Sequence, residues 1–329
     1  MLAYYTKNKL IFHDLENNNE EFIQFSTDKN IESVNFSNNG KYFLVKFYNG
    51  NYKIFEDKVE IANFKYSFGI NIKFHETMNI IGVKKSNYLT IYNLEEMDEN
   101  GDLKIIAEME PNIDPENFFY FYFPTLCETS LIIFTNTSDI YKWDFLSGEY
   151  SLIHSLNFFS GDTEFFAIKN IFIFQNKYLP ENYYFNLETL ELLNYTGINK
   201  YSNNGEILVN KSDDIITLTK FGRTFRIDLP RKIHSFNFST NDKYLEFNSS
   251  TKSYIYDVEN EILINEIELI NITFQSRIFI DNLLIFNSGN SLKIIDVTGE
   301  CEEKNITCED NIFALKYCPV SNSSEYILK

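Results

Sequence analysis

The sequence is poor in the residue types from which most metal and catalytic sites are built. Its 329 residues include only four cysteines, four histidines and one tryptophan. No Cys-x-x-Cys pair occurs and no histidine lies close to a cysteine, so we expect reduced structural thiols and no zinc site. The histidines are spread along the chain, and we expect each to be structural: His13, His75, His154 and His234.

Recognisable catalytic and cofactor motifs are also absent. The sequence contains no Gly-x-Ser-x-Gly elbow, Walker loop, His-Glu-x-x-His or dinucleotide fingerprint. The stretch MDENGD at 97–102 lacks the alternating ligands and the distal glutamate of a calcium-binding EF-hand loop. We therefore predict a protein that is not an enzyme, with no catalytic residues, no cofactor and no metal.

Basic residues are scarce: the chain has 47 acidic and 29 basic residues, so its formal net charge is −18. Such a chain repels phosphate backbones, so we expect no direct binding to nucleic acid or to an anionic membrane. Protein partners with basic surfaces fit this charge better. No window approaches the ~20 apolar residues of a membrane span, and the start MLAYYTKNKLIFHD lacks signal-peptide features. We expect a cytoplasmic location, with the nucleus as the alternative.

Aromatic residues are abundant, with 32 Phe and 22 Tyr, and hydrophobic residues make up 44% of the chain, which is enough for a large core. The aromatic and β-branched bias favours strands. We find no convincing long amphipathic helix, so the pattern predicts an all-β protein.

One short sequence occurs twice in almost the same form. VNFSNNGKYF at Val34–Phe43 shares its frame with FNFSTNDKYL at Phe236–Leu245, and SNNG occurs at Ser37–Gly40 and again at Ser202–Gly205. A unit of about 40 residues divides both separations, as in the blades of a propeller built from repeats. The whole chain then holds eight such units.

Each unit is predicted to form four short strands. In the unit at 31–65 they are IESVNFS, YFLVKFY, NYKIF and VEIANF, with Asn38-Asn39-Gly40 and Asn49-Gly50 at the turns between them. A weaker unit shows only EILVNK, IITLTK and TFRIDL, and a later one begins with NITFQ. The remnants MLAYYT and KLIFHDL at the start, with NIFALKYC and EYILK at the end, together make one more unit.

The strand pairs FSNNGKYFLVKFYNGNYKIFED and FSTNDKYLEFNSSTKSYIYDVE resemble the WD40-repeat family, as do IYNLE, YKWDF and LKIIDV at third-strand ends. Trp143-Asp144 is the one literal Trp-Asp pair, with Asp257 and Asp296 at matching places, whereas the Gly-His dipeptide of the family is missing. The resemblance implies a single β-propeller domain over 1–329, closed by N- and C-terminal strands that share one blade. Eight blades follow from our repeat count, and seven is the alternative.

An acidic segment forms the first candidate binding surface. LEEMDENGDLKIIAEMEPNIDPEN, Leu94–Asn117, is the longest interval between third-strand motifs and concentrates acidic residues. It reads either as a solvated hairpin or as a protruding contact for a basic partner. The candidate residues are Glu95, Glu96, Asp98, Glu99 and Asp102.

A cluster of arginines forms the second candidate. KFGRTFRIDLPRK, Lys220–Lys232, holds Arg223, Arg226 and Arg231, and Arg277 is the only other arginine in the chain. These side chains either balance nearby acids or bind a carboxylate or phosphate through paired hydrogen bonds. Phosphoinositide-binding WD40 relatives carry Phe-Arg-Arg-Gly, and here Phe225-Arg226 continues into Ile227-Asp228, which departs from that motif.

The resemblance implies a non-enzymatic scaffold or adaptor for protein–protein interactions within a larger intracellular complex, with a ribosome- or translation-associated role as one option. A ribosomal protein or a histone-like protein is the candidate basic partner. Two alternatives from other classes stay open: a propeller enzyme with an active site in the central funnel, and a phosphoinositide-binding propeller that uses Arg223 and Arg226.

Overall fold

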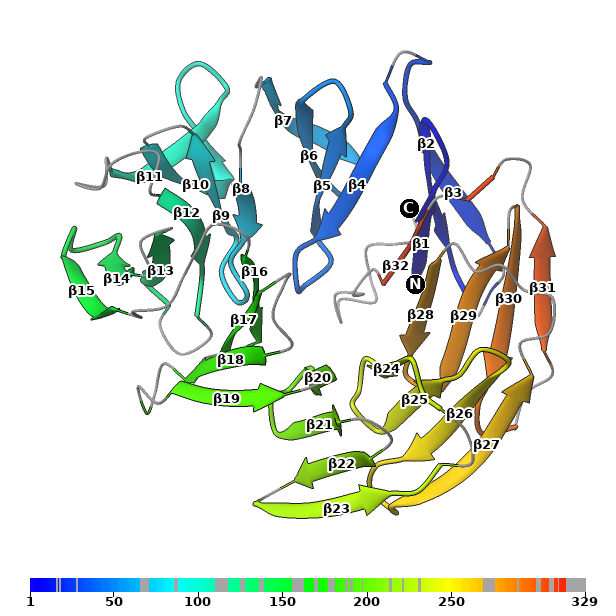
Figure 1. The fold of residues 1–329 in the computed structure, drawn as a ribbon. Helices are drawn as coiled ribbons and strands as arrows, with labels where there is room; N and C mark the ends of the chain where they lie inside the picture. The colour runs from blue at the N-terminus through cyan, green and yellow to red at the C-terminus, as the bar shows by residue number, and fades with distance from the viewer. Residues whose placement is uncertain are drawn as a thin grey trace. The chain divides into compact units, whose positions relative to one another are not determined.

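A computed structural model gives the fold of the chain (Figure 1). The structure describes residues 1–317 except 16, 18, 28, 66–70, 86–87, 110–117, 125–127, 136–138, 156–162, 169–170, 177–180, 187–188, 190–191, 197, 213–214, 221, 230–231, 269–275, 289, 300–302, 308–310 and 313. Among these residues every regular element is a β-strand. The described strands form eight four-stranded antiparallel sheets, distributed over two compact units.

The first unit comprises Met1–Asp28, Pro180–Asn182 and Asn194–Tyr317. Its four sheets, each in the order of hydrogen-bonded neighbours, are β3 (Glu20–Gln24), β2 (Lys9–His13), β1 (Leu2–Tyr5) and β32 (Ala314–Tyr317); β20 (Ile198–Tyr201), β21 (Ile207–Ser212), β22 (Ile215–Lys220) and β23 (Arg223–Ile227); β24 (Ser235–Phe238), β25 (Tyr244–Asn248), β26 (Lys252–Asp257) and β27 (Ile262–Glu268); and β28 (Ser276–Ile280), β29 (Leu283–Ser288), β30 (Ser291–Asp296) and β31 (Lys304–Thr307).

The second unit comprises Lys29–Leu179, Tyr183–Leu193 and Cys318–Lys329. Its sheets, the last of which belongs to it for the most part, are β4 (Ile31–Phe36), β5 (Tyr42–Phe47), β6 (Asn51–Glu56) and β7 (Val59–Lys65); β8 (Asn71–Phe74), β9 (Ile80–Lys85), β10 (Tyr88–Met97) and β11 (Leu103–Met109); β12 (Phe118–Tyr122), β13 (Ser130–Thr135), β14 (Asp139–Asp144) and β15 (Tyr150–Ser155); and β16 (Thr163–Ile168), β17 (Ile171–Asn176), β18 (Glu181–Asn186) and β19 (Leu192–Thr196).

The all-β prediction is confirmed, and so is the sharing of one sheet by the chain's two ends. Strand β32 pairs with β1 over Leu2↔Tyr317 to Tyr5↔Ala314. The eight described sheets equal the number of repeat units in the sequence, while the number of blades and the single domain over 1–329 stay predictions. The predicted strand EYILK lies outside the described residues, and the fourth strand of this sheet is β3.

Two first strands differ from the sequence-based assignment. The unit in which only three strands were predicted has its first strand at β20, where the short INKY follows directly on the preceding sheet. The predicted first strand NITFQ lies outside the described residues, and the sheet begins with β28, whose sequence is SRIFI. Both sheets therefore keep the four-stranded plan.

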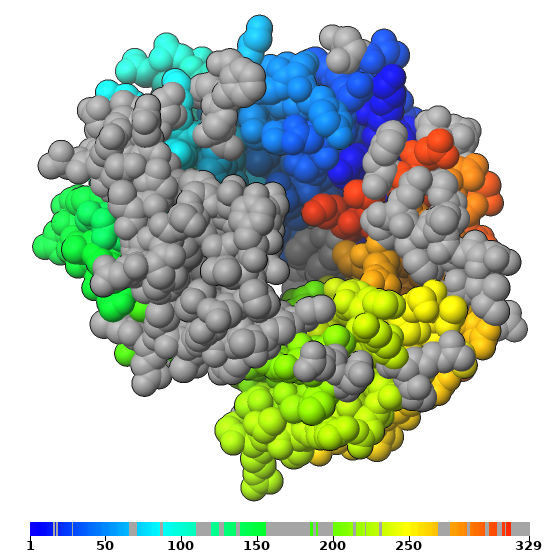
Figure 2. Space-filling model, in the orientation of Figure 1, coloured from blue at the N-terminus to red at the C-terminus, as the bar shows by residue number. Residues whose placement is uncertain are grey.

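Sheets pack face to face within each unit, and the second and third strands are the most deeply buried. Strand β5, YFLVKF, is buried at five of its six positions, whereas the outer strand β7 has no fully buried residue. A sheet covered on both faces reads as a continuous apolar run, and an outer strand half in water alternates. Apolar side chains of sheets β24–β27 and β28–β31 pack together in one buried cluster, and the yellow and orange atoms of these sheets lie against each other in Figure 2.

The duplicated sequence is the turn between the first and second strands of a sheet. In the copy at Ser37, the serine hydroxyl accepts a hydrogen bond from the Tyr42 N–H at 3.0 Å and donates to Asn39 Oδ1 at 2.7 Å. The same two bonds recur at Ser202 and Ser239, with their asparagines at 204 and 241. The serine and asparagine satisfy backbone and side-chain groups of the turn, which explains why the chain repeats them.

The next residue of this turn requires a positive φ. Gly40 and Gly205 have φ of 70° and 75°, and Asp242 holds the corresponding place with φ of 58°. The buried carboxylate of Asp242 accepts hydrogen bonds from Asn203 N at 2.7 Å, Asn203 Nδ2 at 2.8 Å and Asn204 N at 2.7 Å. These bonds join the turn of one sheet to the turn of the sheet before it and offset the strain of the left-handed backbone.

Similar bonds join other consecutive turns. Thr240 Oγ1 donates to Asp281 Oδ1 at 3.1 Å in the first unit, and Asn39 Nδ2 donates to Asn79 Oδ1 at 2.9 Å in the second. Each pair is about one repeat apart in the sequence. These polar links connect sheets in a chain that lacks the Gly-His dipeptide of WD40 repeats.

The Trp-Asp pair has a local role in the third strand and the turn that follows. Trp143 is buried and packs edge-on against Phe145, with ring centroids 6.3 Å apart. Asp144 accepts hydrogen bonds from Ser147 N at 2.9 Å and Thr129 Oγ1 at 2.7 Å, which lower its pKa to about 2. Asp257 and Asp296 accept backbone N–H groups of their own turns in the same way. The matching places predicted for these aspartates are confirmed.

Candidate interaction surface

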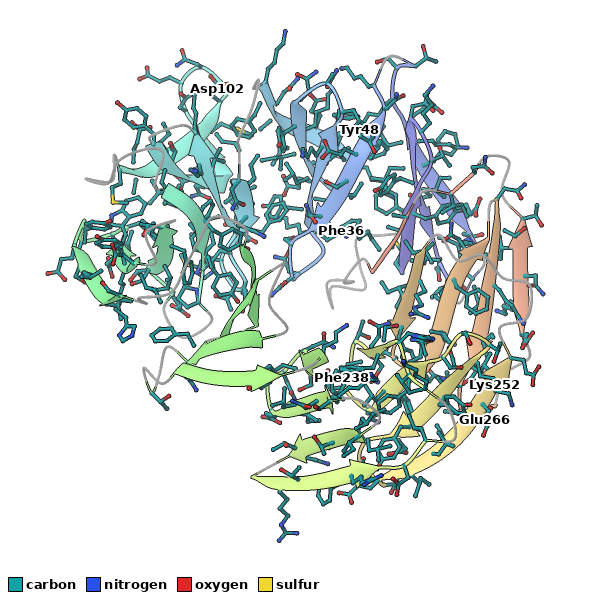
Figure 3. All side chains as sticks on the ribbon, in the orientation of Figure 1. Phe36, Tyr48, Asp102, Phe238, Lys252 and Glu266 are labelled. Atoms are coloured by element: carbon teal, nitrogen blue, oxygen red, sulfur yellow. The ribbon has the colours of Figure 1, made fainter. Side chains whose placement is uncertain are left out.

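The predicted acidic segment forms a long β-hairpin, and Asp102 lies at its tip (Figure 3). Strand β10 has 10 residues, whereas the third strands of the neighbouring sheets, β6 and β14, have six. Its pairing with β11 shifts between Tyr92↔Ile105 and Met97↔Leu103, so four residues of β10 stand opposite one residue of β11. This bulge contains Glu95 and Glu96. The residues 110–117 of the predicted acidic segment lie outside the described part.

The base of the hairpin is held in the core, and its turn is held by an aspartate. Leu94 and Leu103 are 2% and 4% exposed and pack in the cluster between sheets β4–β7 and β8–β11. At the turn, Asp98 Oδ1 accepts hydrogen bonds from Asn100 N at 2.8 Å and Asp102 N at 3.0 Å. The Asp102 and Asn100 N–H groups hold the pKa of Asp98 below its ordinary value. The turn is therefore held by hydrogen bonds, and Asp98 remains ionised at neutral pH.

The acidic residues differ in how far they are already neutralised. Glu95 accepts a hydrogen bond from Asn79 Nδ2 at 2.8 Å and lies 3.6 Å from Lys41 Nζ, and Glu96 pairs with Lys104 at 2.5 Å. Glu99 and Asp102 are exposed and have no ion pair with any residue that the structure describes. In the described ranges, Asp98 accepts only hydrogen bonds from its own turn, so these three carboxylates are the ones that a partner meets without displacing a bound cation.

Apolar side chains accompany the charges on this hairpin. Met97 and Ile105 are 44% and 51% exposed and flank the acidic turn on β10 and β11. Exposed apolar groups of this size next to charges are common in protein interfaces. We name the set of Glu95, Glu96, Met97, Asp98, Glu99, Asp102 and Ile105 the acidic hairpin.

The predicted arginine patch is not a single face among the described residues. Arg223 and Arg226 are both exposed on β23, but they are three positions apart and so project to opposite sides of the strand. Arg226 Nε already donates to Asp228 Oδ1 at 2.8 Å. Arg231 lies outside the described residues. Arg277 lies elsewhere, on β28.

Sequence reasoning missed a buried charged cluster in the first unit. Glu246 on β25 is 1% exposed, lies 3.7 Å from Arg277 Nη1, and accepts a hydrogen bond from Ser253 Oγ at 2.7 Å. Lys200 on β20 donates to Asn237 Oδ1 at 2.8 Å, and burial lowers the pKa of its amine. The available signal was a glutamate between Leu245 and Phe247 in an otherwise apolar strand, because a buried charge requires partners.

Among the described residues, no group of three or more His, Cys, Asp or Glu side chains is placed to hold a metal ion. None of the elements described is a helix long and apolar enough to cross a membrane.

Comparisons with known proteins place the fold. No model of a protein family matches the chain, and no curated protein sequence matches it. A crystal structure of a eukaryotic initiation factor matches with a TM-score of 0.67 at 15% identity, over 96% of this chain and 87% of that one. The C-terminal WD40 domain of Sif2 matches with a TM-score of 0.54 at 10% identity, over 87% and 86%. The dihydro-heme d1 dehydrogenase NirN matches with a TM-score of 0.62 at 8% identity, over 97% and 75%.

At such low identity these likenesses show the fold alone. Together with the four-stranded antiparallel sheets, they define the chain as a β-propeller. Within that class it is a divergent, WD40-like propeller, as the repeat resemblance implied. Proteins with this fold include a dehydrogenase, NirN.

Proposed function

We propose that this protein is a non-enzymatic scaffold that uses the acidic hairpin to bind a partner protein with a basic surface. A propeller displays loops and hairpins from a rigid framework, so a partner contacts them without a large ordering cost. The binding energy then comes from apolar contact at the centre and charge attraction around it.

The acidic hairpin is the observation that carries the proposal. Its turn is hydrogen-bonded, its base is buried, and three of its carboxylates, Asp98, Glu99 and Asp102, have no cation among the described residues. Met97 and Ile105 supply exposed apolar area beside these charges. A basic protein that also offers a small apolar contact is complementary to both features.

The complex that we favour is translation-associated. The likeness to an initiation factor supports this choice at the level of fold, and ribosomal proteins supply the basic surface. A histone-like partner is the second choice, since it offers the same charge. We place the protein in the cytoplasm, or in the nucleus for the histone-like case. The funnel-enzyme and phosphoinositide alternatives stay untested predictions.

A matched pair of variants tests the proposal. Glu99→Gln/Asp102→Asn removes two charges from the acidic hairpin, and Glu259→Gln/Glu261→Gln removes two from another turn between a third and a fourth strand. In pull-downs from an extract we expect the first variant to lose most of a basic partner and the second to retain it. Recovery by the unmodified protein should fall as salt rises, because exposed charges are screened. Equal recovery by both variants, or recovery insensitive to salt, contradicts the proposal.

A further inference from the structure

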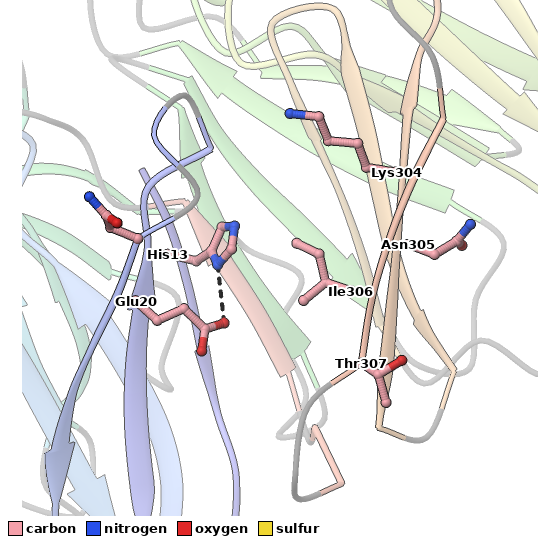
Figure 4. A pocket seen from close by; sticks show the side chains of 7 residues that line it. His13, Glu20, Lys304, Asn305, Ile306 and Thr307 are labelled. Atoms are coloured by element: carbon pink, nitrogen blue, oxygen red, sulfur yellow. Dashed lines mark hydrogen bonds and ion pairs between the residues drawn. The ribbon is translucent and has the colours of Figure 1, made fainter.

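A pocket of about 720 Å³ lies in the first unit, where the outermost strands of two sheets come close together. One wall is formed by the end of β2 and the start of β3, and the other by β31 (Figure 4). This volume is in the range of sites that bind small molecules. Its lining side chains include His13, Glu20, Lys304, Asn305, Ile306 and Thr307.

Glu20 forms a negative end of the pocket. Its Oε1 accepts a hydrogen bond from the Tyr4 hydroxyl at 2.6 Å and lies 3.1 Å from His13 Nδ1. His13 and Glu20 stand directly opposite each other in the β2–β3 pairing, which brings their side chains together. Partial burial opposes ionisation, but the bonds from Tyr4 and His13 outweigh it and hold the pKa of Glu20 below its ordinary value. Glu20 is therefore charged at neutral pH.

His13 lies beside that charge. The residue is only 2% exposed, and Figure 4 shows its ring next to the Glu20 carboxylate. Because an ionised carboxylate can only accept, Nδ1 donates its hydrogen to Glu20. His13 therefore holds the carboxylate in place and reports on its surroundings.

Lys304 forms a positive end on the opposite wall. It is exposed and has no ion pair within the described part of the chain, whereas Lys293 on the neighbouring strand pairs with Glu303 at 2.8 Å. Asn305 and Thr307 also line the pocket. The pocket thus has a carboxylate at one end and an ammonium at the other. A ligand with only a negative charge is repelled by Glu20, and a ligand with only a positive charge is repelled by Lys304.

We propose that this pocket binds a small zwitterion of the amino-acid class, with its ammonium against Glu20 and its carboxylate against Lys304. Only a ligand with both charges is complementary to both ends. The site is separate from the acidic hairpin, and the inference does not depend on the proposed scaffold role.

Histidine-selective NMR tests this directly, because the chain has only four histidines. The protein labelled at histidine carbon is titrated with glycine, 4-aminobutyrate and 6-aminohexanoate, and the His13 signal is assigned with His13→Gln. We expect at least one zwitterion to shift the His13 signal while that of His154 stays in place. Butyrate and butylamine, which carry one charge each, should give no shift at the same concentrations. No shift with any zwitterion, or an equal shift with butyrate or butylamine, overturns the inference.

Charge variants give a second test. Glu20→Gln keeps an acceptor for Tyr4 but removes the negative end, and Lys304→Gln removes the positive end. Each should weaken zwitterion binding by about tenfold, the usual effect of one hydrogen bond to a charged group. Lys293→Gln, on the adjacent strand outside the pocket lining, is the control and should bind as the unmodified protein does. Since Lys304 is exposed, its replacement leaves the fold intact, and unchanged binding by Lys304→Gln contradicts the proposal.

Discussion

Replacement of Asp242 tests whether bonds between consecutive turns stabilise the sheets of the first unit. The Asp242 carboxylate accepts three hydrogen bonds from Asn203 and Asn204, about one repeat earlier in the chain. Asn203 is exposed, so water reaches the released donors and each lost bond costs only about 1 kcal/mol. We therefore expect Asp242→Ala to lower the free energy of unfolding by about 3 kcal/mol.

Replacing Asp242 by glycine distinguishes the energy of the carboxylate's hydrogen bonds from the energy of backbone strain. Asp242 has φ of 58°, the region that glycine adopts without penalty and alanine does not. Asp242→Gly should thus lose the same three bonds but recover about 1 kcal/mol of backbone strain relative to Asp242→Ala. Urea unfolding followed by circular dichroism measures both variants. If Asp242→Gly is as stable as the unmodified protein, the three bonds contribute no more than the ~1 kcal/mol of relieved strain, and the expected loss of about 3 kcal/mol is refuted.

A double-mutant cycle isolates the contact itself. Asn203→Ala removes the Nδ2 donor, which also bonds to Ser239 O at 2.8 Å. We expect the two alanine replacements to be coupled by about 1 kcal/mol, as for residues in direct contact. Strict additivity would show that the two residues act independently, contrary to the geometry.

Two further predictions concern the second unit. A Cβ at Gly82 would lie 2.6 Å from Cε2 of Phe121 and 3.0 Å from Cζ of Phe123, so Gly82→Ala should destabilise the protein by about 2 kcal/mol through overpacking. At Gly101 no atom lies within 4 Å of a Cβ, so Gly101→Ala should cost only the ~1 kcal/mol of strain at its positive φ; a Gly82→Ala cost below ~1 kcal/mol in urea unfolding would contradict the packing argument. Burial lowers the pKa of His75 from 6.5, so His75 contributes stability that is full above pH 6.5 and is lost as the pH falls from 6.5 through the folded-state pKa. His75→Ser, which places at this turn the residue found at 37, 202 and 239, should remove that part of the pH dependence, and an unchanged pH profile of the urea midpoint would refute the assignment.

The sequence predicted most of the architecture because its signals were local and repeated. In the sheet β4–β7, each predicted strand matches an observed strand to within a residue at each end, since Asn-Gly turns and apolar runs coincide there. Strand β20 was missed because INKY is short and only partly apolar. Strand β3 was missed because EEFIQ is mostly polar. It lies at the outer edge of its sheet, where none of its side chains is fully buried and an apolar pattern is not required.

The sites were predicted less completely, and for a different reason. The acidic hairpin was found because its charges are adjacent in the sequence. The pocket joins His13 and Glu20 to Lys304, and the buried cluster joins Lys200, Glu246 and Arg277, which come from separate sheets. Only strand pairing and sheet packing bring such residues together, and neither can be inferred from a short stretch of sequence.

Site-specific photo-crosslinking can show whether a basic partner binds the acidic hairpin. A photoreactive amino acid is placed at Glu99 in one protein and at Ser147 in another, since Ser147 is exposed in the corresponding turn of the next sheet. We expect one basic protein to crosslink strongly from position 99 and weakly from position 147. Equal crosslinking from the two positions, or a partner without a basic surface at position 99, would refute the proposed binding.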